Sequence, residues 1–385
     1  MTSAFEGLKV IDFTTTIAGP HCTRLLADLG ADVIKIEAPE GDMMRTRMPI
    51  RDGASTNFGQ LNAGKRSLVL DLKDEGAIAA VKALVAQADV LVENYRPGVM
   101  KRLGLDYARV KELNPRLVYC SISGYGQTGP SSDLAAYAPV IHASSGYDLA
   151  NLAHQPGRSR PDNCGVYVAD VVAGTYAFGA ISAALHQRNA TGAGQHLDVS
   201  MLEGMLSLTL IEIQGAQFDL PPPPKRPVFG PVRTKDGYIS LAIASERTFQ
   251  GLAAVAGRTD WVEDPRFKRY ADRRANWGDL MDEFEVWSTA LTTQECLAAL
   301  ARQSVPASPY RTVKEVLDDP QIAHRQALAE VSDAGGTFKA LNPPFRMSSS
   351  RTQVGGHAPA LGEHSAKVLA EAGLSPAEIE RLTGA

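Results

Sequence analysis

Asp170 is the residue of this chain whose surroundings most clearly require a chemical explanation. It is a single carboxylate in the apolar stretch VYVADVVAG at residues 166–174. An ionised aspartate is unfavourable among valine and alanine side chains unless it is hydrogen-bonded or faces a cleft. Two interpretations stay open at this point. Asp170 either caps the helix expected beside it, because aspartate is a favoured N-cap residue, or supplies a carboxylate to a catalytic pocket.

The sequence lacks the signatures of several other kinds of catalytic site. None of its eight histidines stands in a His-x-x-x-His pair, so no metal site is expected. No Gly-x-Ser-x-Gly elbow is present, which argues against a hydrolase triad. Residues 14–20 read TTTIAGP in the first β-to-α turn, without the Gly-x-Gly-x-x-Gly fingerprint of dinucleotide-binding proteins. A dinucleotide cofactor is therefore not expected.

Composition limits the class of protein and its partners. The chain has 385 residues, 44% of them hydrophobic, which is enough for two domains. Its formal charge of −4 gives no reason to expect nucleic acid or an anionic membrane as partner. The N-terminus has no long apolar region, and no stretch approaches the roughly 18 apolar residues of a membrane span. Four widely spaced cysteines suggest free thiols. We expect a cytoplasmic protein.

The first part of the chain alternates strand and helix patterns. Strands are expected at residues 8–13, 31–37, 66–72, 88–93 and within 114–123, with helices near 21–29, ending at Gly30, and 76–87. This order predicts a Rossmann-like parallel sheet with helices on both faces, whose ligands bind at the carboxyl ends of the strands. The polar segments to inspect first are residues 14–20, 38–47, 94–98 and 123–130.

The second part predicts a small-residue-rich helix from Asp170 to about residue 188, a strand at 196–200 and a long helix at 202–218. Four prolines at 221–224 mark a linker. Beyond it, a strand at 238–244 and helices within 283–303 indicate a smaller α/β domain, and helices at 366–373 and 375–382 end the chain. We expect a large domain at 1–220, completed by 330–385, and a small domain at 225–329.

Several stretches in a fixed order resemble one family. They are GLKVIDF at 7–13, LGADVIKIE at 29–37, NAGKRS at 62–67, ADVLVENYRPG at 88–98, NPRLVY at 114–119, SGYGQTGP at 123–130 and LGEHS at 361–365. Together they resemble the class III coenzyme A transferases (CaiB/BaiF type) over essentially the whole chain. The resemblance implies an interlocked homodimer that moves CoA from an acyl-CoA, such as succinyl-CoA, to a carboxylic acid, with no permanently bound cofactor.

The resemblance also implies that Asp170 is the nucleophile, through aspartyl anhydride and aspartyl-CoA thioester intermediates. A carboxylate suits this role because it is already ionised at pH 7, with an ordinary pKa of about 3.9. The CoA-binding positions that it implies are Ile17, Ala18, Leu70, Asp71, Leu72, Lys73, Asn94, Tyr95, Arg96, Arg102 and Tyr137. For Lys73 we favour the simpler interpretation of ordinary solvated surface, and for Arg102 we favour phosphate contact.

The chain departs from the family pattern at several positions. Formyl-CoA transferases have Gln where this chain has Ile17, and an adenine-contacting Arg where it has Ala38, so Arg45 or Arg47 would have to replace that contact. Their tetraglycine loop has no counterpart between residues 225 and 238, which disfavours oxalate with formyl-CoA as substrates. For a dicarboxylate acceptor such as succinate, the candidates to bind the distal carboxylate are Arg158, Arg160 and Arg233.

Two alternatives to transfer remain. The related 2-methylacyl-CoA racemases carry a Gly-His-Asp-x-Asn motif whose His is a second base. Residues 136–140 read AYAPV here, without a histidine, and His142 is expected to be structural. The other alternative is a CoA-binding homologue without activity, against which an intact Asp170 argues.

Overall fold

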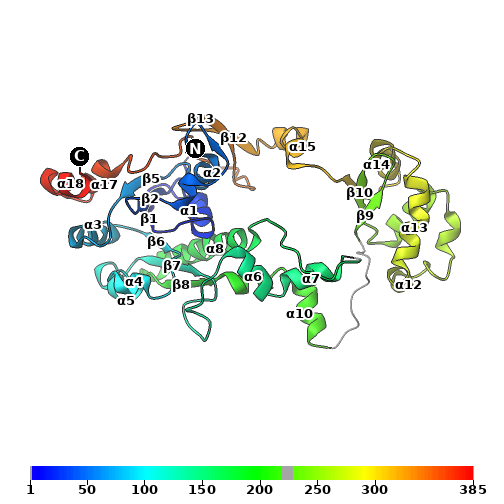
Figure 1. Ribbon diagram of the computed structural model, residues 1–385, viewed down its shortest axis with the longest axis horizontal. Helices are drawn as coiled ribbons and strands as arrows, with labels where there is room; N and C mark the ends of the chain where they lie inside the picture. The colour runs from blue at the N-terminus through cyan, green and yellow to red at the C-terminus, as the bar shows by residue number, and fades with distance from the viewer. Residues whose placement is uncertain (1, 156, 219–228, 385) are drawn as a thin grey trace. The chain divides into compact units, whose positions relative to one another are not determined.

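A computed structural model describes residues 2–155, 157–218 and 229–384 in two compact units (Figure 1). The first unit consists of Met1–Tyr147, Asn163–Leu210 and Pro320–Ala385, and the second of Asp148–Asp162 and Ile211–Asp319. Compared with the expected domain limits, residues 148–162 and 211–218 group with the second unit, and residues 320–329 with the first. The proline run at 221–224 lies outside the described residues.

The first unit is built on a six-stranded parallel sheet with the order β5-β2-β1-β6-β7-β8. Its strands are β1 (Lys9–Asp12), β2 (Asp32–Glu37), β5 (Arg66–Val69), β6 (Val90–Glu93), β7 (Val118–Ser123) and β8 (His196–Ser200). All six were expected from the sequence, and the order is that of doubly wound dinucleotide-binding folds. The direction of winding reverses between β1 and β6, so the fold class predicts the ligand site there.

Alternating side chains of each strand enter two different cores. Val10 of β1 and Val33 of β2 pack on one face of the sheet, whereas Ile11 and Ile34 pack on the other. Since successive side chains of a strand point to opposite faces, a sheet covered on both sides needs apolar residues at both positions. This explains why the strands appear in the sequence as unbroken apolar runs.

Helices cover both faces of this sheet. On the face of Val10 lie α1 (Ala18–Asp28), α6 (Ala138–Ser144), α8 (Val168–Thr191) and α9 (Met201–Leu206). On the face of Ile11 lie α3 (Glu75–Val85), α4 (Val99–Arg102), α5 (Tyr107–Leu113), α17 (Ser365–Glu371) and α18 (Pro376–Thr383). The remaining elements are η1 (Met43–Thr46), β3 (Ile50–Arg51), β4 (Ala54–Ser55), α2 (Thr56–Asn62), α16 (Pro320–His324), β12 (Leu328–Asp333) and β13 (Gly336–Leu341).

Helices α1 and α8 pack closely against each other (Figure 1). Helix α1 begins at Ala18, three residues earlier than expected, because Pro20 is tolerated in a first helical turn. A Cβ atom on Gly174 of α8 would lie only 2.4 Å from the carbonyl oxygen of Ala18. Glycine at position 174 therefore sets the distance between the two helices.

The expected long helix at residues 202–218 is wrong. The chain instead forms α9 and α10 (Leu210–Ala216), separated at residues 207–209. The hydroxyl of Ser207 donates to the carbonyl of Gly204, and that of Thr209 donates to the carbonyl of Leu206. Serine and threonine side chains that bond to nearby backbone compete with the helical ladder, which explains the break.

The second unit has an antiparallel sheet and its own apolar core. The strands are β9 (Pro231–Arg233), β10 (Tyr238–Leu241) and β11 (Ala307–Pro309), in the order β11-β10-β9. Its helices are α7 (Tyr147–Ala153), α10, α11 (Glu246–Val255), η2 (Thr259–Val262), α12 (Tyr270–Ala275), α13 (Trp277–Ser288), α14 (Thr293–Arg302) and α15 (Val313–Leu317). Phe249, Trp261 and Phe284 are fully buried in this core.

Helix α8 has the length and apolar composition of a membrane-spanning helix, although no such stretch was expected from the sequence. A helix that is apolar on most of its surface also suits a protein core. Ala173, Ala177 and Ile181 of α8 are fully buried in the core of the first unit. These contacts place α8 at the centre of that unit.

We expect Gly174→Ala to destabilise the protein by about 1–3 kcal/mol, because the added methyl group would press against backbone atoms of α1. Its melting temperature, followed by circular dichroism, should fall. Gly278→Ala in α13 is the matched control, since a Cβ there meets no atom within 4 Å and alanine favours a helix. Equal stability of the Gly174→Ala protein and the wild type would contradict the close contact.

Candidate active site

A pocket of about 250 Å³ lies at the carboxyl ends of β1 and β6, where the winding of the sheet reverses. The four polar segments singled out in the sequence each contribute to it. Its lining residues are Thr15, Thr16, Ala18, Met43, Asn94, Tyr95, Arg96, Pro97, Ile122, Ser123, Gly124, Ser132, Leu134, Ala136, Tyr137, Asp170 and Met201. Adjoining loops diverge where the winding reverses and leave a crevice, so the pocket lies at the sheet edge where a ligand was expected.

Asp170 lines this pocket from the first turn of α8. The N-cap residue of α8 is Tyr167, which makes no side-chain capping bond, and Asp170 is the third residue of the helix. The interpretation of Asp170 as an N-cap is therefore wrong. The alternative interpretation, a carboxylate in a pocket, agrees with its position.

The environment of Asp170 shifts its proton affinity. Burial, which disfavours a charged carboxylate, raises the pKa of Asp170 to about 6, while a hydrogen bond from the backbone N–H of Ala18 acts in the opposite direction. Ala18 is the first residue of α1, so the carboxylate faces the positive end of that helix. At neutral pH the side chain is mostly ionised, poorly hydrated and able to act as a nucleophile.

His142 supports the first turn of α8. Its side chain is 1% exposed, and its Nε2 accepts a hydrogen bond of 3.1 Å from the backbone N–H of Ala169. This bond satisfies one of the N–H groups that a helix start leaves without a partner. The expectation that His142 is structural is confirmed.

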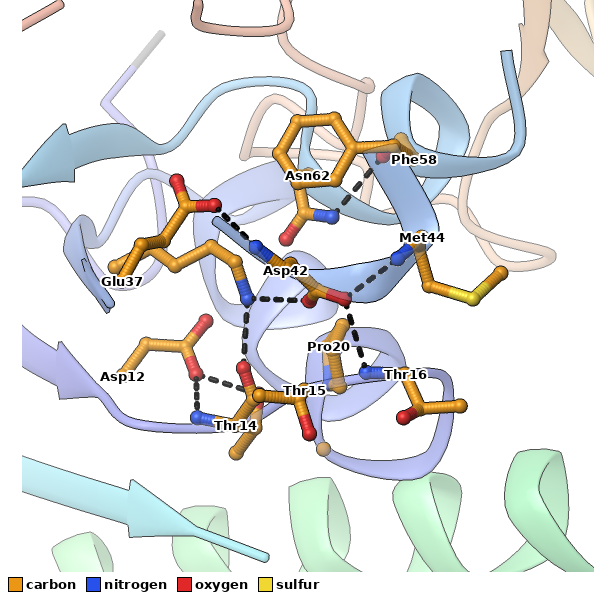
Figure 2. Close-up of polar contacts among 12 residues, drawn as sticks. Asp12, Thr14, Thr15, Thr16, Pro20, Glu37, Asp42, Met44, Phe58 and Asn62 are labelled. Atoms are coloured by element: carbon orange, nitrogen blue, oxygen red, sulfur yellow. Dashed lines mark hydrogen bonds and ion pairs between the residues drawn. The ribbon is translucent and has the colours of Figure 1, made fainter. Parts of the chain in front are cut away.

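The turn between β1 and α1 is held from two sides. The side-chain amide of Asn94 accepts from Thr15 N–H and donates to Thr15 carbonyl oxygen, both at 2.9 Å. Asp42 Oδ1 accepts from the N–H groups of Thr16 and Met44, as Figure 2 shows. Thr16 has a φ of 70°, which is strained for a β-branched residue. These contacts hold Thr16 in that conformation, and α1 starts two residues later.

Buried charges lie beneath this turn. Lys35 Nζ contacts Asp42 at 3.0 Å and donates to Thr14 carbonyl oxygen at 2.6 Å. Lys65 Nζ contacts Asp12 at 3.0 Å. Burial opposes the ionisation of Asp12, yet Lys65 and Lys35 lower the pKa of that carboxyl to about 2. Both pairs are fully buried, so removing one partner would leave an uncompensated charge.

Comparison with known proteins decides the family. The sequence matches the model of CoA-transferase family III over residues 5–365. The chain belongs to this family. It is 34% identical over 385 residues to the succinate–glutarate CoA-transferase of Agrobacterium fabrum, covering 95% of each chain. It is also 37% identical over 351 residues to the acetyl-CoA:oxalate CoA-transferase of Acetobacter aceti, covering 88% of each.

Solved structures agree with this assignment. A CaiB/BaiF family protein from Brucella suis has a TM-score of 0.83 and 34% identity, covering 97% of this chain and 100% of its own. The protein is an enzyme of the CoA-transferase class, with an acyl-CoA as substrate.

Five of the CoA-binding residues implied by the resemblance meet in the pocket of this CoA transferase. They are Ala18, Asn94, Tyr95, Arg96 and Tyr137. The side chain of Tyr137 is 62% exposed, so a ligand could reach it from solvent. This pocket therefore joins Asp170 to part of the predicted CoA site.

The other implied CoA-binding residues lie outside this pocket. Ile17 packs in a separate apolar cluster, and Leu70 is buried in the core on the face of Ile11. Leu72 is half-buried, and Asp71 and Lys73 are exposed beside it after β5. Arg102 lies next to the 94–98 turn, since a Cβ on Gly98 would be 3.5 Å from its Nη1. Their role in binding CoA stays a prediction.

Arg45 is not free to replace the contact missing at Ala38. It forms a two-pronged ion pair with Glu37, with distances of 2.8 and 2.7 Å, and its guanidinium stacks on the ring of Phe58 at 3.7 Å. Arg47 is exposed and stays a candidate.

The three arginines considered for a distal carboxylate, Arg158, Arg160 and Arg233, all belong to the second unit, whereas Asp170 belongs to the first. Arg158 forms an ion pair with Asp162. Within the first unit, the pocket that contains Asp170 has Arg96 as its cationic lining residue.

Sequence reasoning missed several residues that shape the site. Asp42 and Lys35 hold the first turn, and Ser123 borders the pocket. Asp42 and Ser123 lie in polar segments that were singled out, but neither residue was given a role of its own. One signal was present, because Lys35 is a charged residue inside an apolar strand pattern. Its partners, however, come from loops whose approach only the folded sheet defines.

We expect the rate of this enzyme to depend on the ionisation of Asp170. Burial raises its pKa to about 6, so the nucleophilic form is lost as the pH falls below that value. A plot of log kcat/KM against pH should bend near 6 and fall about tenfold per unit below it. Circular dichroism at each pH serves as the control for folding. A profile that is flat between pH 5 and 7 would contradict this assignment.

Proposed function

We propose that this enzyme transfers CoA from an acyl-CoA to a carboxylic acid through covalent intermediates on Asp170. The observation that carries the proposal is the composition of the pocket. Among its lining residues in the described chain, Asp170 is the one acid and none is a histidine. A carboxylate nucleophile needs no partner base, so a single acid is sufficient for this chemistry.

The reaction proceeds in four exchanges that need no net proton transfer. Asp170 adds to the thioester carbonyl, giving a mixed anhydride and CoA thiolate. The thiolate then attacks the aspartyl carbonyl, which releases the donor acid and leaves an aspartyl-CoA thioester. The acceptor carboxylate forms a second anhydride and frees CoA again. Attack of the thiolate on the acceptor carbonyl gives the new acyl-CoA and restores Asp170. Thiolate is a competent leaving group because its pKa is about 8.5.

The same pocket gives little support to racemisation. Two-base racemisation needs a second proton-transfer group near the substrate. His142, the histidine nearest in sequence to the position of the racemase motif, is 1% exposed and accepts a backbone hydrogen bond through Nε2.

A short dicarboxylate is the acceptor that we propose. The relatives named above act, by their names, on succinate and glutarate or on oxalate, all of which are dicarboxylates. A volume of about 250 Å³ is below the roughly 300–1,000 Å³ of pockets for drug-sized ligands and suits a short acyl chain. Arg96 is exposed at this pocket and could contact a distal carboxylate or a CoA phosphate.

The interlocked homodimer also belongs to this proposal. The first unit has a second cavity of about 1380 Å³, lined by apolar residues such as Val171, Phe178 and Phe345 together with polar and charged ones such as Arg325 and Glu330. This volume exceeds what a small ligand fills, and passage of a second chain would occupy it. Leu210 and Ile211 are 68% and 77% exposed, which is unfavourable in water and favours burial in an interface.

We further propose a cytoplasmic enzyme without a permanently bound cofactor. The four cysteines are free thiols, which a reducing compartment preserves. Among the residues that the structure describes, no group of three or more His, Cys, Asp and Glu side chains could hold a metal ion.

The decisive experiment incubates the enzyme with succinyl-CoA and looks for a CoA adduct on Asp170 by mass spectrometry of the digested protein. Transfer to glutarate should exceed transfer to the matched monoacid valerate. Asp170→Ala should lose both the adduct and about 1,000-fold or more of kcat.

Glu112→Gln is the control for this experiment, because Glu112 is an exposed acid on α5 away from the pocket. It should retain wild-type transfer. Retained transfer in Asp170→Ala would refute the covalent mechanism. An Arg96→Gln protein separates the two roles of Arg96: a higher KM for every acyl-CoA indicates phosphate contact, and a loss confined to diacids indicates the distal carboxylate.

An interlocked homodimer should have twice the 41.2 kDa chain mass by light scattering. Because threaded chains separate only when they unfold, tagged and untagged dimers should not exchange subunits after mixing. Exchange should appear only after joint denaturation and refolding. Rapid exchange in native buffer would contradict threading, and a mass of one chain would contradict dimerisation.

A further inference from the structure

Ser123 is a buried residue whose hydroxyl has no partner among the residues that the structure describes. It is the last residue of β7 and is 7% exposed. Its Oγ atom makes no hydrogen bond within the described part of the chain. Other buried serines of the first unit differ: the hydroxyl of Ser365, also 7% exposed, accepts from Val69 N–H at 3.1 Å. A buried polar group without a partner destabilises the fold, so its presence requires an explanation.

The position of Ser123 connects this hydroxyl to the reaction. Ser123 borders the pocket that contains Asp170, on the strand end that faces α8. The next residue is fixed in place, because a Cβ on Gly124 would lie 2.2 Å from the Cβ of Ala136, and the Gly124 carbonyl accepts from Leu202 N–H at 3.0 Å. Ser123 is therefore held rigidly at the pocket wall, with an unused donor.

Without a substrate, the Ser123 hydroxyl does not donate to the Asp170 carboxylate. The hydrogen bond that affects the Asp170 carboxylate comes from the backbone of Ala18, and Ser123 contributes none. During attack on a thioester, negative charge develops on the former carbonyl oxygen of the substrate. This oxygen is a different atom from the two carboxylate oxygens of Asp170, so it needs a donor of its own. Donors fixed near such an oxygen accelerate acyl transfer because they need no reorganisation.

We propose that the Ser123 hydroxyl donates a hydrogen bond to the oxyanion formed when Asp170 adds to the acyl carbonyl of the substrate. This inference rests on the proposed function. A bond forms between a carboxylate oxygen of Asp170 and the acyl carbon, and the carbonyl electron pair moves to oxygen. When the carbonyl electron pair returns and re-forms the C=O bond, the carbon–sulfur bond breaks. The electrons of that bond stay on the CoA sulfur. Ser123 keeps its proton throughout.

The test is Ser123→Ala in the full-length enzyme. We expect kcat to fall about 100-fold, as on removal of one oxyanion donor, while KM for the acyl-CoA stays within about twofold. The melting temperature should stay the same or rise, because an unsatisfied buried hydroxyl is removed. Ser123→Cys, with a weak S–H donor, should have an intermediate kcat.

Ser365→Ala is the matched control, because it removes a hydroxyl of equal exposure that has a partner. It should lower the melting temperature and leave kcat unchanged. Wild-type kcat in Ser123→Ala, a change confined to KM, or a lower melting temperature would each overturn the inference. If the wild type forms no adduct on Asp170, the proposed function itself fails; an adduct formed by wild type and by Ser123→Ala at equal rates refutes only the role of Ser123.

Discussion

The contact between α1 and α8 sets the surroundings of Asp170. Gly174 lets α8 approach the carbonyl oxygen of Ala18, and one turn earlier in the same helix Asp170 accepts the N–H of Ala18. The two helices cross on one face of the sheet, so the start of α1 and the start of α8 meet above its carboxyl edge. A larger residue at 174 would separate the Asp170 carboxylate from the backbone N–H that stabilises its charge.

Opposed effects on the Asp170 carboxylate follow from that contact. Burial raises its pKa to about 6, whereas the backbone donor of Ala18 keeps the ionised form accessible at neutral pH. A fully solvated carboxylate would be a weaker nucleophile, because water would have to leave it before attack. A more deeply buried one would be protonated at pH 7. In the first turn of α8, the Asp170 carboxylate is buried to a degree between full solvation and complete burial.

Buried polar side chains hold the turn between β1 and α1 in place, although the sequence of this turn lacks the glycine fingerprint of dinucleotide-binding proteins. The side chains of Asn94 and Asp42, from the loops after β6 and β2, hold Thr15 and Thr16. Lys35 and Lys65 neutralise the acids beneath. Such a network is stabilising only when every member has a partner, so its members depend on one another. Ser123 at the pocket wall lies outside this network, and its hydroxyl has no hydrogen-bond partner within the described residues.

The sequence by itself determined the strands of the large sheet and the loops that line the pocket, because strand patterns and chain order are local properties. It also singled out Asp170, a charge in an apolar stretch. Tertiary structure decided what local patterns do not encode: that Tyr167 and not Asp170 begins α8, that residues 202–218 form two helices, and that Arg45 is committed to Glu37. It alone showed that the Ser123 hydroxyl has no partner in the described part of the chain. The physical reason is that a hydrogen bond or ion pair needs two groups brought together from distant parts of the chain, and only the packed fold fixes that distance.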